Sequence, residues 1–220
     1  MSKCLIKKAR HTSRILVPTS VCLVTWAAMA VRTSAQTRRD QILEEAARLF
    51  GRRGYHATSM RDIGGATGML AGSLYSHISS KEDLLNEIVL RAANRFLSEL
   101  SAILAEDLTP EERLRRAMRA HVAVVASNVD AAWVFHHEWK SLTGERREEV
   151  RRLRRRYEGL WDGIVRELPG AADPRFARLL VLSSANWTYT WYRPDGPLSP
   201  DEVADRFTDL LLAGLGEEKR

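Results

Sequence analysis

The chain has 220 residues, of which 45% are hydrophobic, and it is long enough to bury a sizeable core in one or two compact units. Its formal net charge of +6 arises in residues 1–35, which contain basic side chains but no acidic one, so the rest of the chain is neutral overall. This distribution excludes a uniformly basic fold, and any affinity for nucleic acid must come from a local placement of charges.

Residues 1–35 imitate a secretory signal peptide. They combine basic residues, an apolar run over residues 15–26 and the small-residue sequence Ala28-Met29-Ala30. Pro18 interrupts this run, which is also too short to span a bilayer. The simpler interpretation is that Met29 is the true start, followed by a short basic arm. The alternative is an exported helical protein that uses residues 1–28 as a signal. If the longer form is made, we expect residues 1–35 to be disordered.

Both cysteines, Cys4 and Cys22, lie in this same segment. The remainder of the chain therefore has no disulfide framework and no cysteine-based metal site, which suits a reducing cytoplasm. We expect a cytoplasmic protein.

Helical periodicity begins near Thr37. The first predicted helix ends at Gly51 or Gly54. Its apolar stripe consists of Ile42, Ala46, Leu49 and Phe50.

Two short helices follow. The first covers residues 59–66, with Thr58 as its N-cap and Gly68 as the residue that ends it through a positive φ. The second covers residues 71–77 and begins with small residues, which allow a backbone to approach another surface closely. Helix, glycine turn and helix is the arrangement that places a recognition helix in the major groove of DNA.

The rest of the chain predicts further helices. Helix starts are expected at Ser80, Thr109, Asp130, Asp173 and Ser199, a further helix is expected from an apolar stripe that includes Val150, and the longest loop is expected at residues 193–199. The helix from Ser80 runs through about Ala105, the helix from Asp130 carries Trp133 and Trp139, and the stripe from Val150 ends at Pro169-Gly170. Neither strand alternation nor a membrane-spanning run is present. The expected fold class is all-α, with about nine helices.

The region from about Arg38 to Leu90 resembles the N-terminal DNA-binding domain of TetR-family transcriptional regulators. The matching residues are Thr58, Arg61, Asp62, Ile63, Gly68, Gly72, Leu74, Tyr75, His77, Lys81, Asp83 and Leu84. Leu70 departs from the family pattern, because a polar cap usually precedes the recognition helix, and Ile78 replaces the usual Phe; the first departure leaves the start of that helix open. The resemblance implies a helix-turn-helix domain over residues 36–84 and a helical ligand-binding and dimerisation domain over residues 85–220.

The resemblance also implies the DNA contacts. They map onto Thr58, Ser59, Arg61, Ala71, Gly72, Ser73, Tyr75, Ser76, His77 and Lys81. Tyr75 and His77 can donate to phosphate oxygens, and Lys81 lies in the first turn of a helix whose N–H groups can hold a phosphate. Arg61 can bridge O6 and N7 of a guanine. The alternatives are a core position for Tyr75 and surface pairing of Arg61 with Asp62, Glu44 or Glu45. Leu74 and Ile63 are assigned to the core.

Five of the six tryptophans lie in the second half of the chain. Aromatic side chains with a polar edge suit the lining of an apolar ligand cavity, which a TetR-like C-terminal half implies. The residues assigned to this cavity are Trp133, His137, Tyr157, Trp161, Trp187 and Trp191. The alternative is that they belong to ordinary helical core and dimer surface.

Residues 186–215 resemble more specifically the branch of the family that contains acyl-CoA-responsive repressors of fatty-acid and sterol breakdown. This resemblance implies an effector with a long apolar part and a phosphorylated head. Arginines would bind the head, and the chain offers Arg146, Arg147, Arg151, Arg152, Arg154, Arg155 and Arg156. The alternatives are a solvated helix face for these arginines, and a different apolar effector such as a drug or an aromatic acid, as in regulators of efflux or aromatic catabolism.

The family resemblance further implies a homodimer that represses transcription and leaves DNA when it binds its effector. The last two helices of each subunit would form a four-helix interface, with Leu179, Leu182, Phe207, Leu210 and Leu211 at its centre. Two recognition helices would then meet successive major grooves about 34 Å apart on double-stranded DNA, so the operator is expected to be an inverted repeat.

Metal binding and catalysis are not expected. His136, His137 and Glu138, with His121 upstream, suggest a metal site, but adjacent histidines on a helix point about 100° apart and cannot share one ion unaided. The sequence has no nucleophile elbow and no phosphate-binding loop. We therefore expect no cofactor and no metal, and a small helical enzyme is the remote alternative.

Overall fold

The computed structural model describes residues 37–170 and 173–216 of the chain. The chain divides into two units, Met1–Arg39 and Asp40–Arg220. In the first unit the structure describes only residues 37–39, which are helical. Our expectations for residues 1–35 lie outside the described residues.

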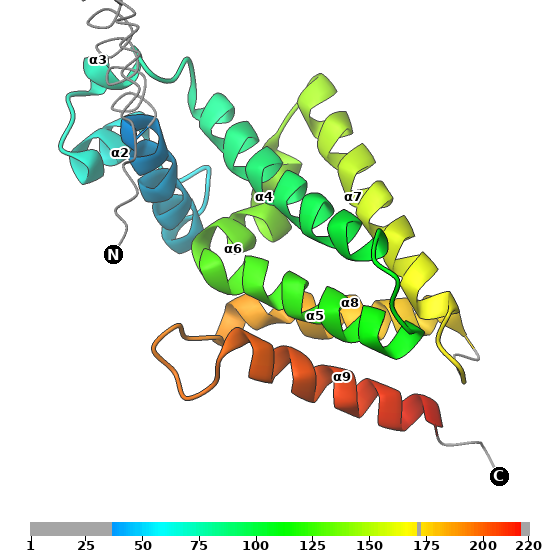
Figure 1. The fold of residues 1–220 in the computed structure, drawn as a ribbon. Helices are drawn as coiled ribbons and strands as arrows, with labels where there is room; N and C mark the ends of the chain where they lie inside the picture. Colours follow the sequence, from blue (N-terminus) through cyan, green and yellow to red (C-terminus); the bar gives the residue numbers. More distant parts are fainter. Residues whose placement is uncertain (1–36, 171–172, 217–220) are drawn as a thin grey trace, which may run out of the picture. The chain divides into compact units, whose positions relative to one another are not determined.

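The described residues contain nine α-helices, one 3₁₀ helix and no strand, which confirms the all-α fold class (Figure 1). The first helix covers residues 37–53. The others are α2 (Met60–Thr67), α3 (Ala71–Leu74), α4 (Lys81–Leu104), α5 (Pro110–Ser127), α6 (Val129–His137), η1 (Glu138–Ser141), α7 (Gly144–Arg166), α8 (Pro174–Trp191) and α9 (Pro200–Gly216). Among the described residues, no helix is both long and apolar enough to cross a membrane.

Local capping explains most of these boundaries. Thr109 and Glu112 form a reciprocal capping box ahead of α5, Ser80 caps α4, and Asp173 caps α8, all at predicted starts. The first helix ends before Gly54, which has a φ of 86°. Among the helices that follow α5, two boundaries differ from the predictions. Asn128 rather than Asp130 caps α6, so that Trp139 falls on η1, and α7 ends at Arg166, before Pro169.

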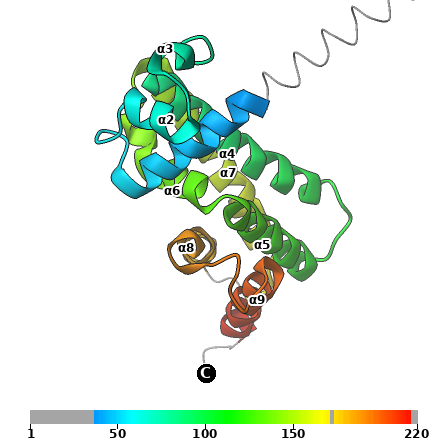
Figure 2. The ribbon, with the colours of Figure 1, turned by 90° about the vertical axis from the view of Figure 1, so that its left-hand side faces the viewer.

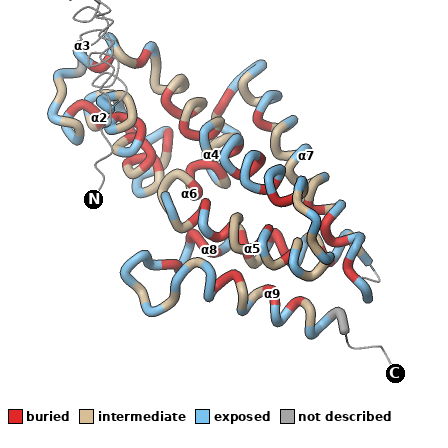
Figure 3. Tube along the Cα trace, in the orientation of Figure 1, coloured by how far each residue is buried: buried red, intermediate tan, exposed pale blue. Residues whose placement is uncertain are grey.

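Two clusters of buried apolar side chains hold the larger unit together. Buried positions recur along the helices of this unit (red in Figure 3). The first joins the helix that precedes α2 to α2, α3, α4 and α6, and includes Phe50, Ile63 and Leu85. The second lies among α5, α7, α8 and α9, and Trp161 is its largest fully buried side chain. Burial of this kind stabilises by roughly 1.5–3 kcal/mol for each large side chain. In the larger unit, α2 and α3 lie at one end and α8 and α9 at the other (Figures 1 and 2).

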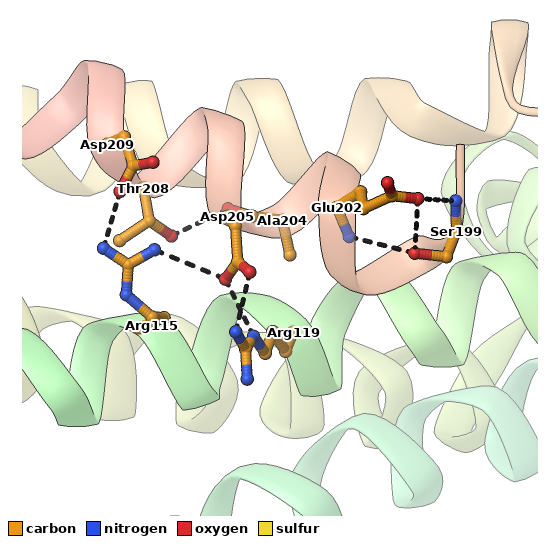
Figure 4. A network of polar contacts seen from close by, with 8 residues as sticks. All are labelled: Arg115, Arg119, Ser199, Glu202, Ala204, Asp205, Thr208 and Asp209. Carbon is orange, nitrogen blue, oxygen red and sulfur yellow. Dashed lines mark hydrogen bonds and ion pairs between the residues drawn. The ribbon is translucent and has the colours of Figure 1, made fainter. Parts of the chain in front are cut away.

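A network of ion pairs joins α9 to α5 (Figure 4). The Asp205 carboxylate accepts hydrogen bonds from Nε and Nη2 of Arg119 at 2.7 and 2.6 Å, and Asp209 accepts one from Arg115 at 2.6 Å. The Arg119 hydrogen bond is the largest cause that lowers the pKa of Asp205. The paired geometry fixes the direction of α9 along α5.

Candidate DNA-binding surface and effector cavity

The helix-turn-helix consists of α2, a glycine turn and α3. α2 begins at Ser59, whose backbone N–H donates to the Asp62 carboxylate at 2.8 Å while its hydroxyl accepts from the Asp62 N–H at 3.2 Å. The helix ends at Gly68, which has a φ of 66°, a conformation that strains any other residue. The predicted end is therefore confirmed, but the predicted N-cap is wrong by one residue.

The recognition helix is shorter than predicted. Only residues 71–74 are α-helical, and residues 75–77 form a turn in which the backbone N–H groups of His77 and Ile78 both donate to the carbonyl of Leu74 at 2.9 Å. Leu70 occupies the N-cap without a side-chain hydrogen bond and is 81% exposed. Because an apolar side chain cannot satisfy the free N–H groups of a first helical turn, the start of α3 lacks a cap.

Six of the predicted DNA-contact residues are exposed: Ser59, Arg61, Gly72, Ser73, Tyr75 and Ser76. His77 is half-buried, and the side chain of Ala71 lies outside the described residues. Tyr75 is 55% exposed, so the alternative that it belongs to the core is wrong. Leu74 and Ile63 are fully buried, as predicted. Their burial attaches α3 and α2 to the apolar core, and the polar residues of the two helices remain exposed.

Arg61 is available for a ligand. The Asp62 carboxylate is taken by Ser59 and lies 3.6 Å from Arg53, and Glu45 accepts a hydrogen bond from Arg48 at 2.8 Å. In residues 37–170 and 173–216, Arg61 has no hydrogen bond or ion pair of its own. These contacts do not support the surface-pairing alternative.

Thr58 does not face solvent. Its side chain is 1% exposed, and its hydroxyl donates to the carbonyls of Gly54 at 2.9 Å and Leu49 at 3.4 Å. The prediction of a side-chain DNA contact at Thr58 is therefore wrong, because the hydroxyl is used to hold the turn between the first helix and α2.

Lys81 also has an internal role that the sequence did not reveal. Its ammonium donates to the carbonyls of Tyr55 at 2.9 Å and Thr58 at 2.8 Å, and lies 4.4 Å from the centroid of the Tyr55 ring. An ammonium has three N–H donors, and two of them are used inside the fold. Lys81 therefore ties the start of α4 to the turn that precedes α2.

The same turn is held from the C-terminal half of the chain. The Tyr55 backbone N–H donates to Glu138 Oε1 at 3.0 Å, and Glu138 belongs to η1. A second link joins the N-terminus of α4 to the loop before α7, where the Thr143 N–H donates to Glu82 at 2.9 Å and Arg146 pairs with Asp83. The segments that flank the helix-turn-helix on both sides are thus connected to η1 and to the start of α7.

A narrow cavity lies among α4, α5, α6, α7 and α8, with about 30 Å³ of free interior. Its apolar wall consists of Ala93, Phe96, Phe135, Leu153 and Leu182, and its polar wall of His121, His136, Arg154, Tyr157, Glu158 and Asn186. The His121 Nδ1 lies 2.7 Å from the Tyr157 hydroxyl. Burial is the main cause that lowers the pKa values of His121 and His136 to about 3, and it raises the pKa of Tyr157. At neutral pH the cavity therefore contains neutral imidazoles and a protonated phenol.

The cavity adjoins a more open, basic depression, which we call the basic mouth. His136, Arg154 and Glu158 belong to both hollows. The other residues that line the basic mouth are Trp139, Lys140, Arg151 and Arg155. Arg154 lies over the rings of Phe135 and Trp139, at 5.0 and 5.2 Å from their centroids, and desolvation is the main cause that lowers its pKa. Arg154 is therefore a half-buried cation where the cavity meets the basic mouth.

The predicted effector-binding residues are not all in this cavity. Tyr157 lines it, and Trp161 is fully buried behind it, 6.3 Å from the Tyr157 ring. Trp133 stacks on His137 at 4.6 Å, and His137 Nε2 lies 2.7 Å from the Tyr189 hydroxyl. Trp187 and Trp191 are 61% and 45% exposed, so their assignment to the cavity is wrong. These two residues follow a different face of α8, because tertiary packing, not aromatic content, decides which face turns inward.

Sequence reasoning missed most of the polar wall. The sequence suggests His121 and His136 only as metal ligands, and Arg154 only as one member of an arginine run. In the described residues, no group of three or more potential ligands could hold a metal ion. The available indication was spacing: Leu153, Tyr157 and Trp161 share one helical face, and Arg154 lies beside it.

A stripe of exposed apolar side chains runs along α8, and we call it the α8 stripe. It consists of Phe176, Leu179, Leu180, Trp187 and Trp191. Leu210 of α9 is also exposed, at 72%, whereas Leu182 and Leu211 are buried within one chain at 9% and 6% exposure. Of the predicted interface residues, Leu179 and Leu210 therefore face outward, Phe207 is half-buried, and Leu182 and Leu211 belong to the core. An exposed stripe of this kind marks an interaction surface.

Comparison with known proteins agrees with this geometry. The family model described as "Bacterial regulatory proteins, tetR family" matches residues 42–88, and that described as "Tetracyclin repressor-like, C-terminal domain" matches residues 107–215. The HTH-type transcriptional repressor KstR2 of Rhodococcus jostii (strain RHA1) is 30% identical over 185 residues, which cover 81% of this chain and 91% of that protein. The chain belongs to the TetR family of transcriptional regulators.

Solved structures similar to this chain have the same fold. PfmR from Thermus thermophilus has a TM-score of 0.71 and 38% identity, over 80% of this chain and 99% of that one. AibR, solved in complex with isovaleryl coenzyme A and operator DNA, has a TM-score of 0.68 and 32% identity, over 80% of this chain and 98% of that one. This TetR-family chain is therefore a DNA-binding transcriptional regulator with an N-terminal helix-turn-helix.

Proposed function

We propose that this TetR-family regulator represses transcription as a homodimer on an inverted-repeat operator, and that it leaves the operator when an acyl-CoA binds in the cavity. The observation that carries the effector class is the junction at Arg154, where an aromatic chamber opens onto the basic mouth. The protein acts in the cytoplasm as a regulator, not as an enzyme. Its DNA-binding domain comprises residues 36–84 and its effector and dimerisation domain residues 85–220.

On the DNA side, we assign base and phosphate contacts to the exposed polar residues around α3. Arg61 is exposed and has no ion pair in the described part of the chain, so its guanidinium can read a guanine edge in the major groove. Ser73, Tyr75 and Ser76 supply hydroxyls for phosphate oxygens, and Gly72 allows close approach of the backbone. Lys81 and Thr58 contribute indirectly, because their hydrogen bonds fix the turn before α2.

Dimerisation supplies the second recognition helix. The α8 stripe and Leu210 expose apolar side chains on the helices that the family resemblance assigns to the interface. Pairing of two such faces around a two-fold axis removes these side chains from water, at roughly 25 cal/mol for each Å² buried. An operator with two half-sites matches that symmetry.

The effector must make contacts in both the cavity and the basic mouth. Phe96, Phe135 and Leu182 offer contacts to an acyl group, and the cations of the basic mouth offer contacts to phosphates. Arg154 is desolvated between two aromatic rings, and an anionic group would compensate that cost. Similarity to AibR, whose structure contains isovaleryl coenzyme A, supports the same class.

The size of the cavity supports a switch. A free interior of about 30 Å³ holds no acyl chain, so binding requires the surrounding helices to separate. The effector then prefers a conformation other than this one, as any population shift requires. A shift from 1:99 to 99:1 needs about 5.5 kcal/mol of differential affinity, and at about 0.8 kcal/mol per methylene an acyl chain of roughly seven carbons supplies it.

Fluorescence anisotropy of an inverted-repeat DNA from the region upstream of the gene tests this function. The repeat should bind tightly at fixed salt, and a medium-chain acyl-CoA should release it while the free acid does not. Arg154→Gln should raise the ester concentration for half-release by about tenfold or more, because charge-assisted contacts contribute roughly 1.5–3 kcal/mol. Arg156→Gln is the matched control, since Arg156 lies exposed on the same helix and outside both hollows.

The outcomes separate the two halves of the proposal. DNA binding that no ester affects would overturn the effector class and leave the regulator intact. Release by an uncharged aromatic compound instead of an ester would favour a regulator of efflux or aromatic catabolism, because the cavity wall is itself aromatic. Failure to bind any inverted repeat near the gene would overturn the operator assignment.

A further inference from the structure

The cavity contains a buried imidazole nitrogen that the protein leaves unused. His121 of α5 is 2% exposed and lines the cavity, and its Nδ1 is paired with the Tyr157 hydroxyl at 2.7 Å. Its Nε2 is buried and has no hydrogen-bond partner within the described residues. A buried polar atom without a partner is costly, so native structures rarely keep one without a use.

His136, on α6, also has a buried ring nitrogen without a partner among the described residues. It belongs to the last turn of α6, its ring stacks on Tyr189 with centroids 5.3 Å apart, and it lines the same cavity. Its Nε2 is also buried and unpartnered in residues 37–170 and 173–216. Two helices thus each contribute a cavity-lining histidine whose Nε2 is buried and has no partner among the described residues.

The protonation of these rings defines what they can bind. Burial is the largest cause that lowers the pKa of both histidines to about 3. At His121 the nearby Asn186 amide opposes this lowering of the pKa, but it does not complete a hydrogen bond to Nε2. A neutral imidazole has one N–H donor and one acceptor. Tyr157 keeps its proton because burial raises its pKa, and when it donates to Nδ1 of His121 the remaining Nε2 carries an N–H. That N–H needs an oxygen acceptor.

We infer that the buried part of the preferred effector carries oxygen, as a carbonyl or hydroxyl group that meets Nε2 of His121 and Nε2 of His136, and that a plain saturated acyl chain of the same length binds more weakly. This inference rests on the proposed function and deepens it by naming the class of acyl group. The apolar wall of Phe96 and Leu182 still requires a hydrocarbon frame around the oxygen.

The discrimination has a physical basis. The free interior of about 30 Å³ is too small to hold an acyl chain together with solvent that could pair with the two imidazole nitrogens. A saturated chain therefore leaves both nitrogens unpaired, whereas an oxygenated chain supplies a hydrogen-bond partner. Sites built to hydrogen-bond a ligand reject the analogue that lacks the group far more strongly than apolar pockets reject an extra methylene.

Calorimetric titration of the purified protein, without DNA, tests the inference directly. The probes are octanoyl-CoA and its analogues with one ketone oxygen at carbon 5, 6 or 7. At least one oxo ester should bind about tenfold or more tightly than octanoyl-CoA. His121→Leu and His136→Leu should each reduce that ratio. His56→Leu is the control, because His56 is exposed and outside the cavity.

Each contrary result points to a different failure. Equal affinities of octanoyl-CoA and every oxo ester would overturn the inference and leave the proposed function standing. Absence of binding by any ester, with operator binding intact, would overturn the acyl-CoA effector and this inference together. A preference that survives in both histidine variants would show that other groups recognise the oxygen. The comparison of esters on the unmodified protein needs no variant, so this test of the inference remains valid even if a variant fails to fold.

Discussion

Lys81 illustrates how one side chain can support the DNA-binding half from inside the fold. The ammonium donates to the carbonyls of Tyr55 and Thr58, on the turn that carries α2. Lys81→Met keeps the stem and removes both hydrogen bonds, and we expect a loss of roughly 1–3 kcal/mol in unfolding free energy. Operator affinity should also fall, because α2 and α3 lose a support. Chemical denaturation and anisotropy at several salt concentrations measure both effects.

The salt dependence separates a positioning role from a phosphate contact. Loss of a phosphate contact lowers the slope of log affinity against log salt by about 0.9, whereas loss of positioning leaves the slope unchanged. We expect an unchanged slope for Lys81→Met. Lys140→Met, at an exposed lysine far along the chain, should alter neither stability nor slope. A reduced slope with full stability would return Lys81 to the DNA contacts.

His121 should make folding stability depend on pH. Its pKa of about 3 in the folded state lies below the ordinary value of 6.5, because burial disfavours the charged ring. The unfolded chain therefore binds the proton first, so the stability is complete above pH 6.5 and falls as the pH drops toward 3. Between pH 7 and pH 5 this histidine alone should cost about 2 kcal/mol.

Comparison with His121→Phe at both pH values isolates that contribution. The variant should lose about 2 kcal/mol less than the unmodified protein between pH 7 and pH 5, as measured by urea denaturation. The interval lies above the titration range of most carboxylates, so Asp83 and Asp205, whose pKa values are lowered, contribute little to the difference. Equal losses in the two proteins would mean that the folded chain admits the proton at His121.

At the scale of elements, α3 is the least secured helix of the DNA-binding half. It has four residues, and Leu70 offers no side-chain cap. Leu70→Ser supplies a hydroxyl for a free N–H of the first turn, and we expect a gain of roughly 0.5–1 kcal/mol in stability. Leu70→Ala removes the same exposed side chain without adding a cap and is the matched control. A thermal melt of the two variants should show the serine variant as the more stable.

Helix positions were largely predictable because they depend on local chemistry. Thr109 with Glu112, Asp173 with Pro174, and Gly68 each set a boundary through their own backbone requirements, and the structure places boundaries there. Which face of each helix turns toward the core was less predictable. Trp187 lies one turn before Trp191 and both face outward, whereas Trp161 is buried, and nothing in their spacing distinguishes them.

The polar wall of the cavity was also beyond local reasoning. His121, His136 and Arg154 belong to three helices, and only tertiary packing brings them to one chamber. The same holds for Lys81, whose partners lie 26 and 23 residues earlier in the chain. Contacts of this kind arise from helix packing, which single-residue propensities do not encode.

At the scale of the whole molecule, the α8 stripe predicts the oligomeric state. Leu180 is 58% exposed at the centre of the stripe. Leu180→Asp places a charge where an apolar contact is expected, and desolvation of that charge should shift the protein toward monomers. Light scattering after size exclusion measures the change. Arg175→Asp, at an exposed position near the start of α8, is the control and should leave the dimer intact. A dimer that survives Leu180→Asp would place the interface elsewhere.

A short path of contacts joins the cavity to the DNA-binding half. His136 lines the cavity, Glu138 follows two residues later on η1, and the Glu138 carboxylate accepts the Tyr55 N–H at 3.0 Å. Tyr55 in turn is bound by Lys81, at the start of α4. Helices that separate around an effector would therefore move the acceptor that holds the turn before α2.

Glu138→Ala should weaken this coupling more than it weakens either binding event. The variant keeps the cavity and the exposed DNA contacts, so effector affinity without DNA should change little, while the ratio of effector affinities with and without operator should approach one. Coupling free energies of this kind are typically about 1–3 kcal/mol and must be the same when measured from either ligand, so operator affinity with and without effector provides an independent check. Glu148→Ala, on the exposed face of α7, is the matched control. An unchanged ratio in Glu138→Ala would show that the movement reaches the helix-turn-helix by the other link, through Arg146 and the N-terminus of α4.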